Sequence, residues 1–353
     1  MTHALFETMT AQPAYDGEAA QLVELNNAVG TRVVLMDIGA TWLSCRLPLA
    51  SGEQREVLLG VGAMEDFQRQ QGYLGVTVGR YANRIANGLF QIEGESYQVS
   101  TNQAGNCLHG GAEGFDKRRW QIVERSEQHV LFALHSKDGD QGFPGNVTVS
   151  VRYLLSDDNA LHIDYLATSD KTTPINLTNH GYFNLNGTTS ELDARAHTLS
   201  IEADYYLPTT EVGIPLGDLV SVEGTSFDFR QPKSVAADLL ADTQQQQAKG
   251  YDHSFFLAPE REVKAPIATL TSQDERVSVS VITTQPAIQL YTGNWLGGAP
   301  RREGGEYQDY AGIALETQFL PDSPNHPEWP QPSCLLKPKE QYRQQTIYQF
   351  MCH

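Results

Sequence analysis

The chain has 353 residues, 40% of them hydrophobic, and a formal net charge of −18 at pH 7. Nucleic acids and anionic membrane surfaces both require clustered Lys and Arg, so this charge argues against either partner. No stretch approaches the roughly 18 continuous apolar residues that indicate a membrane-spanning helix, so we expect no membrane span.

The predicted strands begin close to the N-terminus. Residues 21–25, 31–39 and 41–49 are β-rich runs that Gly and polar turns separate. Helical patterns are weak. They cover only 63–70 and 234–247, and both segments are short enough to be peripheral.

The clearest hairpin is predicted over 147–167. Apolar and polar residues alternate from Val147 to Leu155, the residues SDDNA turn the chain, and the alternation resumes from Leu161 to Ala167. A further alternating run covers 277–281. Many short strands without intervening helices predict one all-β domain, residues 1–353, built as a large antiparallel β-sandwich.

The four cysteines lie far apart, without a CxxC pair: Cys45, Cys107, Cys334 and Cys352. Such spacing favours reduced thiols over a disulfide framework. The first 17 residues lack the basic region and the apolar run of a signal peptide. We therefore expect a cytoplasmic protein.

The segment 173–187, TPINLTNHGYFNLNG, is polar for a chain of strands. A buried amide needs several hydrogen-bond partners, and an unpaired one costs roughly 1–3 kcal/mol. One interpretation is a strand end that lines a hydroxyl-rich cleft, with His180 at its centre, because Asn, His and Tyr can bind a sugar. The other is a strand-to-turn junction whose Asn side chains bond only their own backbone.

Three further motifs carry candidate binding residues. GRYANRIANG (79–88) holds Asn83 and Arg84, NCLHGG (106–111) holds His109, and YDHSFFL (251–257) holds Asp252. A guanidinium fork or a carboxylate can bind sugar hydroxyls. Each motif also fits an ordinary surface turn or strand end, since Arg is mostly exposed and Gly-Gly is a common turn.

Glu316 is the candidate base. It follows the apolar run Ile313–Leu315 and precedes a proline-rich loop. A carboxylate at the end of an apolar strand loses hydration, which raises its pKa and suits it to proton transfer. An exposed strand terminus is the commoner position for a single Glu. No metal-ligand spacing, nucleotide-binding loop or nucleophile elbow occurs, so no metal or cofactor is predicted.

Six strings occur in a fixed order: GRYANRI, LHGG followed by GFDKRRW, NLTNHGYFNL, YDHSFFL, QPAIQLYTGN and LETQ. Together they resemble the aldose 1-epimerase (galactose mutarotase) family along essentially the whole chain. The resemblance implies an antiparallel β-sandwich of the galactose-mutarotase type without a cofactor. It also implies an isomerase that interconverts the α and β anomers of free aldoses such as galactose and glucose.

The matching motifs imply that His180 is the acid and Glu316 the base of this reaction. They also imply a set of sugar-binding residues: Asn83, Arg84, His109, Gly181, Tyr182, Asp252 and Gln289. Residues 208–250 match the family less clearly, so any specificity set there stays open. The partners expected are free monosaccharides, and the expected state is a monomer or weak homodimer.

The chemistry of the reaction is consistent with this pair. Changing the anomer requires a base that takes the C1 hydroxyl proton and an acid that protonates the ring oxygen, and closing the ring reverses both transfers. The two residues must then start as carboxylate and imidazolium. We expect their mutual attraction, and the charge of Asp252, to keep His180 protonated.

Three alternatives remain. A hexose-6-phosphate 1-epimerase of the same fold would need extra Arg or Lys at the cleft rim. A non-catalytic sugar-binding module would need no acid/base couple. A glycosidase that used Asp252 and Glu316 would leave His180 without a role.

Overall fold

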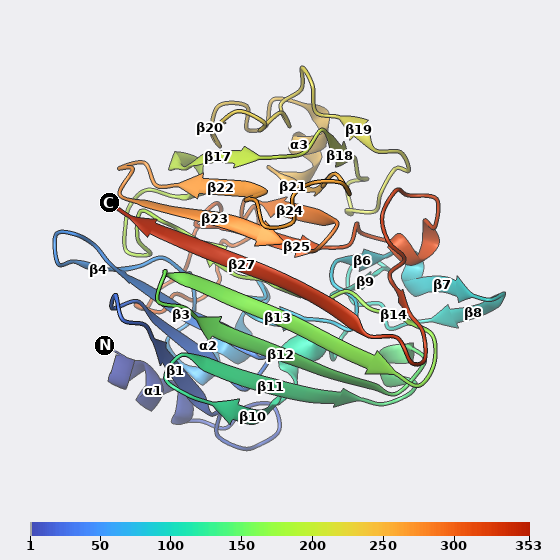
Figure 1. The fold of residues 1–353 in the computed structure, drawn as a ribbon, viewed down its shortest axis with the longest axis horizontal. Coiled ribbons are helices and arrows are strands. Elements are labelled where there is room, and N and C mark those ends of the chain that lie inside the picture. Colours follow the sequence, from blue (N-terminus) through green and yellow to red (C-terminus); the bar gives the residue numbers. More distant parts are fainter. Residues whose placement is uncertain (1) are drawn as a thin grey trace.

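The fold is given by a computed structural model that describes residues 2–353. The largest sheet has nine strands, and every hydrogen-bonded neighbour in it is antiparallel (Figure 1). In sheet order the strands are β10 (Gln121–Arg125), β11 (His129–Ser136), β12 (Val147–Leu155), β13 (Ala160–Ser169), β27 (Tyr342–Cys352), β23 (Val277–Thr283), β22 (Ala268–Thr271), β17 (Thr198–Ile201) and β20 (Lys233–Ser234).

The hairpin predicted over 147–167 is formed by β12 and β13. Val147 pairs with Ser169 and Leu155 with Leu161, so the alternating apolar residues of both strands point to the same side. Those residues are fully or almost fully buried. The alternating run 277–281 likewise forms β23. Successive side chains of a strand point to opposite faces, and only one face is buried here. Apolar and polar residues therefore alternate along these strands.

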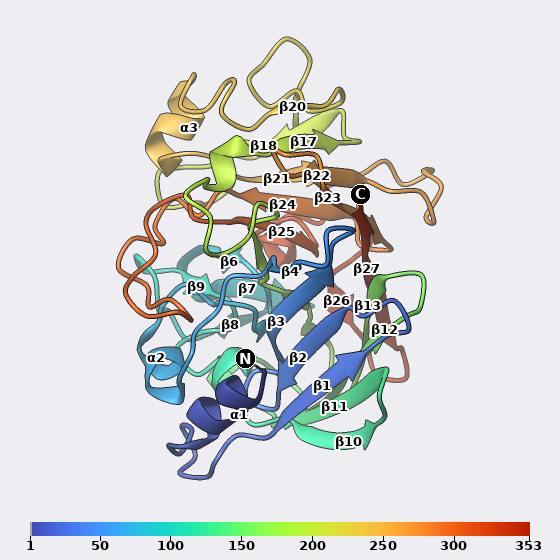
Figure 2. The same ribbon diagram turned by 90° about the vertical axis from the view of Figure 1, so that its left-hand side faces the viewer.

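Two smaller sheets share the core with the nine-stranded sheet. One has six strands, in the order β16 (Tyr182–Phe183), β25 (Ile313–Gln318), β24 (Ala287–Tyr291), β21 (Asp252–Phe256), β18 (Tyr205–Leu207) and β19 (Val220–Ser221). The other has four strands, drawn in blue in Figure 2: β1 (Leu22–Asn26), β2 (Arg32–Met36), β3 (Thr41–Pro48) and β4 (Gln54–Glu56). The strands predicted within 21–49 are therefore confirmed.

Trp42 shows how the sheets pack together. Its ring, on β3, lies 5.6 Å from that of Phe183 on β16 and 5.4 Å from that of Tyr348 on β27, measured between ring centroids. One side chain thus contacts all three sheets, and it is fully buried. The antiparallel sandwich predicted from the sequence is confirmed.

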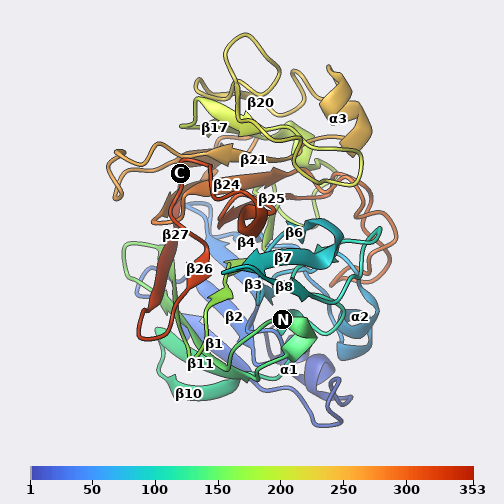
Figure 3. The same cartoon turned by 90° about the vertical axis from the view of Figure 1, so that its right-hand side faces the viewer.

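Four short two-stranded ladders lie apart from these sheets, and some of their strands are labelled in Figure 3. They pair β5 (Thr77–Val78) with β15 (Thr178–Asn179), β6 (Arg84–Ile85) with β9 (Cys107–Leu108), β7 (Leu89–Ile92) with β8 (Glu95–Gln98), and β14 (Thr173–Pro174) with β26 (Leu335–Leu336). Five 3₁₀ turns lie between strands: η1 (Ala86–Gly88), η2 (Phe115–Lys117), η3 (Asp140–Gly142), η4 (Ala194–Ala196) and η5 (Ser323–Asn325).

The helices differ in part from the prediction. The segment 63–70 contains α2 (Met64–Arg69), as predicted, but 234–247 does not form one helix. It begins in β20, continues as turns and becomes helical only in α3 (Thr243–Ala248). Leu240 has a left-handed backbone (φ +63°), which interrupts the helix, and Asp242 then starts α3 by accepting a hydrogen bond from the N–H of Gln245.

The sequence pattern also missed α1 (Thr2–Thr10), which buries Leu5 and Met9 and is too short for a clear period. Over the described residues, no helix is both long and apolar enough to cross a bilayer. All four cysteines are free thiols, which confirms the prediction against a disulfide framework.

Candidate active site

The polar segment 173–187 folds into the short strands β14, β15 and β16, and almost all of it is buried. Asn176 and Asn179 donate hydrogen bonds to main-chain carbonyls around β5 (3.1 and 2.7 Å). Only two of the described residues in this segment, His180 and Tyr182, line the cavity that lies beside the six-stranded sheet. Neither interpretation from the sequence holds in full, because these amides bind other segments rather than a ligand or their own turn.

The six-stranded sheet explains why His180 and Glu316 meet. Tyr182 of β16 lies opposite Ala314 of β25 in an antiparallel pair. If this register is extended to two residues before the start of β16, His180 falls opposite Glu316. Since side chains two residues apart share a face of a strand, both residues point to the same side as the first pair.

The next two strands extend this face. Gln289 of β24 lies opposite Glu316, and Asp252 of β21 lies opposite Tyr291 of β24. The period of two therefore directs Asp252, Gln289, Tyr291 and Glu316 to one side of the sheet. One sheet face thus supplies two carboxyl groups and an aromatic ring.

This face forms one wall of a cavity of about 380 Å³, within the range of ~300–1,000 Å³ usual for small-molecule sites. Loops supply the other walls. Besides residues of the sheet face, the lining comprises Gln71, Gly72, Tyr73, Asn83, Arg84, Gln103, Leu108, His109, Thr209, Thr210, Glu211, Val212, Gly213, Gln247, Ala248, Trp295 and Leu296. Amide, hydroxyl and aromatic groups predominate, as a polyhydroxylated ligand requires.

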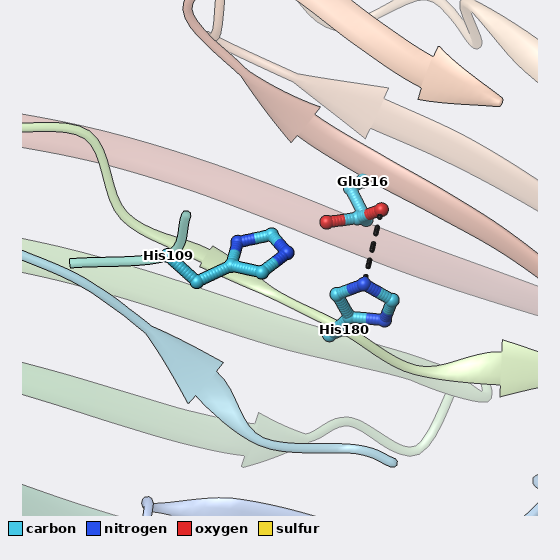
Figure 4. Close-up of side chains that lie close together, drawn as sticks. All are labelled: His109, His180 and Glu316. Atoms are coloured by element: carbon cyan, nitrogen blue, oxygen red, sulfur yellow. Dashed lines mark ion pairs between the residues drawn. The ribbon is translucent and has the colours of Figure 1, made fainter. Parts of the chain in front are cut away.

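His180 and Glu316 are in contact inside this cavity. Nε2 of His180 lies 3.5 Å from Oε1 of Glu316, and His109 lies beside the pair (Figure 4). The other polar atoms of the pair, Nδ1 of His180 and Oε2 of Glu316, are buried without a hydrogen-bond partner among residues 2–353. Such atoms are rare in folded proteins, and they mark this pair as a place where a ligand can complete the hydrogen bonding.

Burial determines the charge states of the pair. It raises the pKa of the Glu316 carboxyl well above its usual value and lowers the pKa of the His180 imidazole to about 4. The charge of Asp252 raises the pKa of His180, but by less. In the free protein burial therefore favours the uncharged form of each residue.

Burial opposes the expected pairing of a carboxylate with an imidazolium, because it disfavours both charged forms. Asp252 acts on His180 in the expected direction, yet the loss of hydration outweighs it. The charged forms that the reaction requires and the uncharged forms that burial favours are related by one proton transfer between the two residues.

His109 is held as a neutral donor. The main-chain N–H of Asn83 donates to Nδ1 of His109 (3.1 Å), so the neutral ring carries its proton on Nε2. Burial, with smaller contributions from His180 and Arg84, lowers the pKa of His109 well below its usual value. Gly110 makes this turn possible, since its φ is +90° and a Cβ there would lie 2.0 Å from the carbonyl oxygen of Gly79.

Arg84 and Asp252 are fixed by their neighbours. Nε of Arg84 donates to Oε1 of Gln103 (3.1 Å), and its Nη2 lies 3.8 Å from Oδ2 of Asp252. Oδ1 of Asp252 accepts a hydrogen bond from Nε2 of Gln289 (2.6 Å), and Gln289 in turn accepts one from Ser254. Both charged groups therefore face the cavity with restricted orientations.

Seven of the nine residues that the motifs indicated line the cavity: Asn83, Arg84, His109, His180, Tyr182, Asp252 and Glu316. Gln289 lies behind Asp252 and is 2% exposed. Gly181 faces away, because a side chain there would point at Asn179, Leu58 and Trp42. The alternation of a strand places it on the opposite face from its two neighbours.

Sequence reasoning missed several lining residues, notably Tyr73, Gln103, Tyr291, Trp295 and the loop 209–213. The signal for Tyr291 was present, because it lies two residues after Gln289 in the same motif, QPAIQLYTGN. The others come from loops, where no periodic pattern exists to find them.

The fold also brings together three groups that sequence spacing did not connect. His109, His180 and Glu316 offer possible metal ligands within 4.8 Å of one another. The fit is poor, because Nε2 of His109 carries a proton and burial favours the uncharged carboxyl of Glu316. The set is better suited to hydrogen bonding and proton transfer.

Comparison with known proteins gives consistent matches. Residues 21–349 match the family model described as aldose 1-epimerase. The chain is 53% identical to the aldose 1-epimerase of Escherichia coli K12, over 98% of this chain and 99% of that protein. It is 39% identical to human galactose mutarotase, over 90% and 91%. A solved aldose epimerase homologue from C. elegans superposes with a TM-score of 0.85 at 29% identity, covering 95% of this chain and 99% of that one.

Proposed function

The chain belongs to the aldose 1-epimerase family of isomerases, and we propose that it interconverts the α and β anomers of free aldohexoses such as D-galactose and D-glucose. The observation that carries the proposal is the buried contact between His180 and Glu316, at 3.5 Å, each with a polar atom left unpaired. A module that only bound sugar would need no such acid/base couple.

We assign the base to Glu316 and the acid to His180. Glu316 takes the proton of the C1 hydroxyl while His180 protonates the ring oxygen, and the C1–O5 bond breaks to give the open-chain aldehyde. Rotation about C1–C2 exposes the other carbonyl face. The two residues then return the protons in reverse, so that the ring closes as the other anomer.

This assignment requires a protonated His180 and an ionised Glu316, which are the forms that burial disfavours. The two residues can exchange one proton across their contact of 3.5 Å. A sugar whose hydroxyl donates to the Glu316 carboxylate would stabilise the charged form of that residue. We infer that substrate binding drives this transfer.

The remaining charged groups orient the sugar. We propose that Asp252 accepts hydrogen bonds from sugar hydroxyls, while Arg84 and Nε2–H of His109 donate to sugar oxygens. Asn83 and Tyr182 complete this set, and Gln289 acts through its hydrogen bond to Asp252. Each contact acts by holding the sugar in the reactive orientation.

The charges favour a free sugar over a sugar phosphate. Among the described lining residues Arg84 is the only Lys or Arg, and Asp252 already lies 3.8 Å from it. Glu211 adds another acidic group. A phosphate binds best to uncommitted Arg or Lys groups, which this lining does not supply.

We further propose a single domain over residues 1–353 that acts as a monomer or weak homodimer in the cytoplasm. One hydrophobic cluster runs from Val23 to Phe350, which supports a single domain. Four free thiols suit a reducing compartment.

Polarimetry tests the proposal directly. The purified protein should speed the change in optical rotation of fresh α-D-galactose and α-D-glucose well beyond the spontaneous rate. We expect kcat/KM for galactose to exceed that for galactose 6-phosphate by at least about tenfold. Equal or better use of the phosphate would replace this assignment by a hexose-6-phosphate epimerase.

A further inference from the structure

Tyr73 occupies a position that its sequence context does not explain. It lies in the loop between α2 and β5 and lines the cavity. Its ring makes an edge contact with that of His109 (4.6 Å between centroids) and stacks on that of His180 (5.9 Å, 27° between planes). The two histidine rings are themselves 5.3 Å apart, so the three rings form one cluster.

The backbone of Tyr73 is held in an unfavourable conformation. Its φ is +55°, in the left-handed region that residues other than Gly, Asn and Asp rarely adopt. Such a conformation persists only where the surrounding structure fixes it, and it occurs preferentially at functional sites.

Two hydrogen bonds tie the loop of Tyr73 to His180. The N–H of Gly75 donates to the carbonyl of His180 (2.9 Å), and the N–H of His180 donates to the carbonyl of Val76 (2.8 Å). The position of the Tyr73 ring is therefore coupled to the backbone of His180. The ring contact and the backbone contacts act on the same residue.

We propose that Tyr73 is a positioning residue of the reaction, whose ring holds His180 in place against Glu316 and keeps water out of the space beside the two imidazoles. The proposal rests on the proposed function for the role of His180. It goes beyond that function because it assigns a task to a residue outside the acid/base pair and outside the predicted sugar-binding set.

The electrostatic consequence concerns the affinity of His180 for its proton. Titratable or charged groups face His180 from each neighbouring element: Glu316, Asp252, Arg84, His109, Tyr182 and Tyr291, together with Tyr73 itself. Burial is the largest influence and lowers the pKa of His180 to about 4. The Tyr73 ring stacks on His180, so its removal would admit water to this buried imidazole.

Two substitutions separate the ring from the backbone. Tyr73→Phe keeps the ring and removes the hydroxyl. Tyr73→Gly removes the ring, and glycine accepts φ +55° without strain, so the loop can keep its path. Tyr310→Gly is the matched control, because Tyr310 has φ +65° and its ring lies over Arg195.

The titration of His180 is followed by NMR of protein labelled with ¹³C at histidine, with its signal assigned by its loss in His180→Asn. In Tyr73→Gly we expect the midpoint to rise by at least about one pH unit, because water reaches the ring. The acidic limb of kcat/KM should move in the same direction, and kcat should fall about tenfold or more as His180 loses its fixed position. Tyr73→Phe and Tyr310→Gly should keep the wild-type midpoint.

An unchanged midpoint in Tyr73→Gly would overturn the proposal, whether or not kcat fell. Such a midpoint would show that the variant is folded and that His180 stays shielded from water without the Tyr73 ring. A midpoint that rose equally in Tyr310→Gly would overturn it as well. The midpoint is measured without substrate, so it decides the role of Tyr73 separately from the proposed function. A wild-type protein without mutarotase activity would refute only the latter.

Discussion

Replacing Glu316 by Gln tests the chemical core of the proposed mechanism. The substitution keeps the shape of the side chain and an oxygen that can accept a hydrogen bond, but it removes the basic group. Loss of a positioned general base typically lowers the rate by about 10²–10⁴-fold, or roughly 3–5 kcal/mol of transition-state stabilisation. We expect kcat to fall by this amount while KM changes only a few-fold, since the sugar-binding residues are untouched.

The structure predicts a different outcome for stability. Burial raises the pKa of Glu316, so above its ordinary pKa the unfolded chain releases a proton that the folded protein retains. Folding stability then falls as the pH rises from that ordinary value towards the folded-state pKa. Gln carries no proton to lose and can donate a hydrogen bond. Glu316→Gln should therefore unfold at the same or a higher temperature than wild type at pH 8.

Polarimetry on fresh α-D-galactose, with the spontaneous rate subtracted, measures the loss of kcat, and thermal unfolding followed by circular dichroism measures stability. Glu124→Gln is the control, because Glu124 is exposed and lies on β10, the edge strand of the nine-stranded sheet, whereas Glu316 lies in the six-stranded sheet. The reasoning would be refuted if Glu316→Gln kept more than about a tenth of the wild-type kcat. Activity lost together with a lowered unfolding temperature would indicate a structural role instead.

Four further predictions use the same assays. His180→Asn should lower kcat by about 10²–10⁴-fold, and its combination with Glu316→Gln should be little worse than the poorer single variant; multiplicative losses would show that the two residues act independently. Asp252→Asn should raise KM as well as lower kcat, because Asp252 is assigned to hold hydroxyls, and an unchanged KM would contradict that role. Dialysis against EDTA should leave full activity, whereas a loss that zinc or manganese reversed would refute the cofactor-free mechanism. Burial lowers the pKa of His197 from 6.5 to about 4, so the unfolded chain takes up a proton that the folded protein does not, and the free energy of unfolding falls as the pH falls from 6.5 towards 4. His197→Gln should reduce this fall between about pH 7 and pH 5 by about 2 kcal/mol, measured by urea titration.

The sequence by itself determined the fold class and most of the site. Alternation in 147–167 required a half-buried antiparallel hairpin, because only one face of β12 and β13 meets the core. The order of six short motifs indicated the family, and those motifs held most of the charged groups that line the cavity. Strand-borne residues were predictable because a period of two fixes the face on which each lies.

The tertiary structure alone decided which polar residues face the cavity and which hold other segments in place. Asn176 and Asn179 look like ligand-binding amides in the sequence, yet both are used to satisfy main-chain carbonyls of other segments. Tyr73 reaches His180 from a loop, and loops have no period that could reveal such a contact. The raised pKa of Glu316 was also beyond the sequence, because the loss of hydration that causes it depends on the atoms that surround the carboxyl in the folded chain.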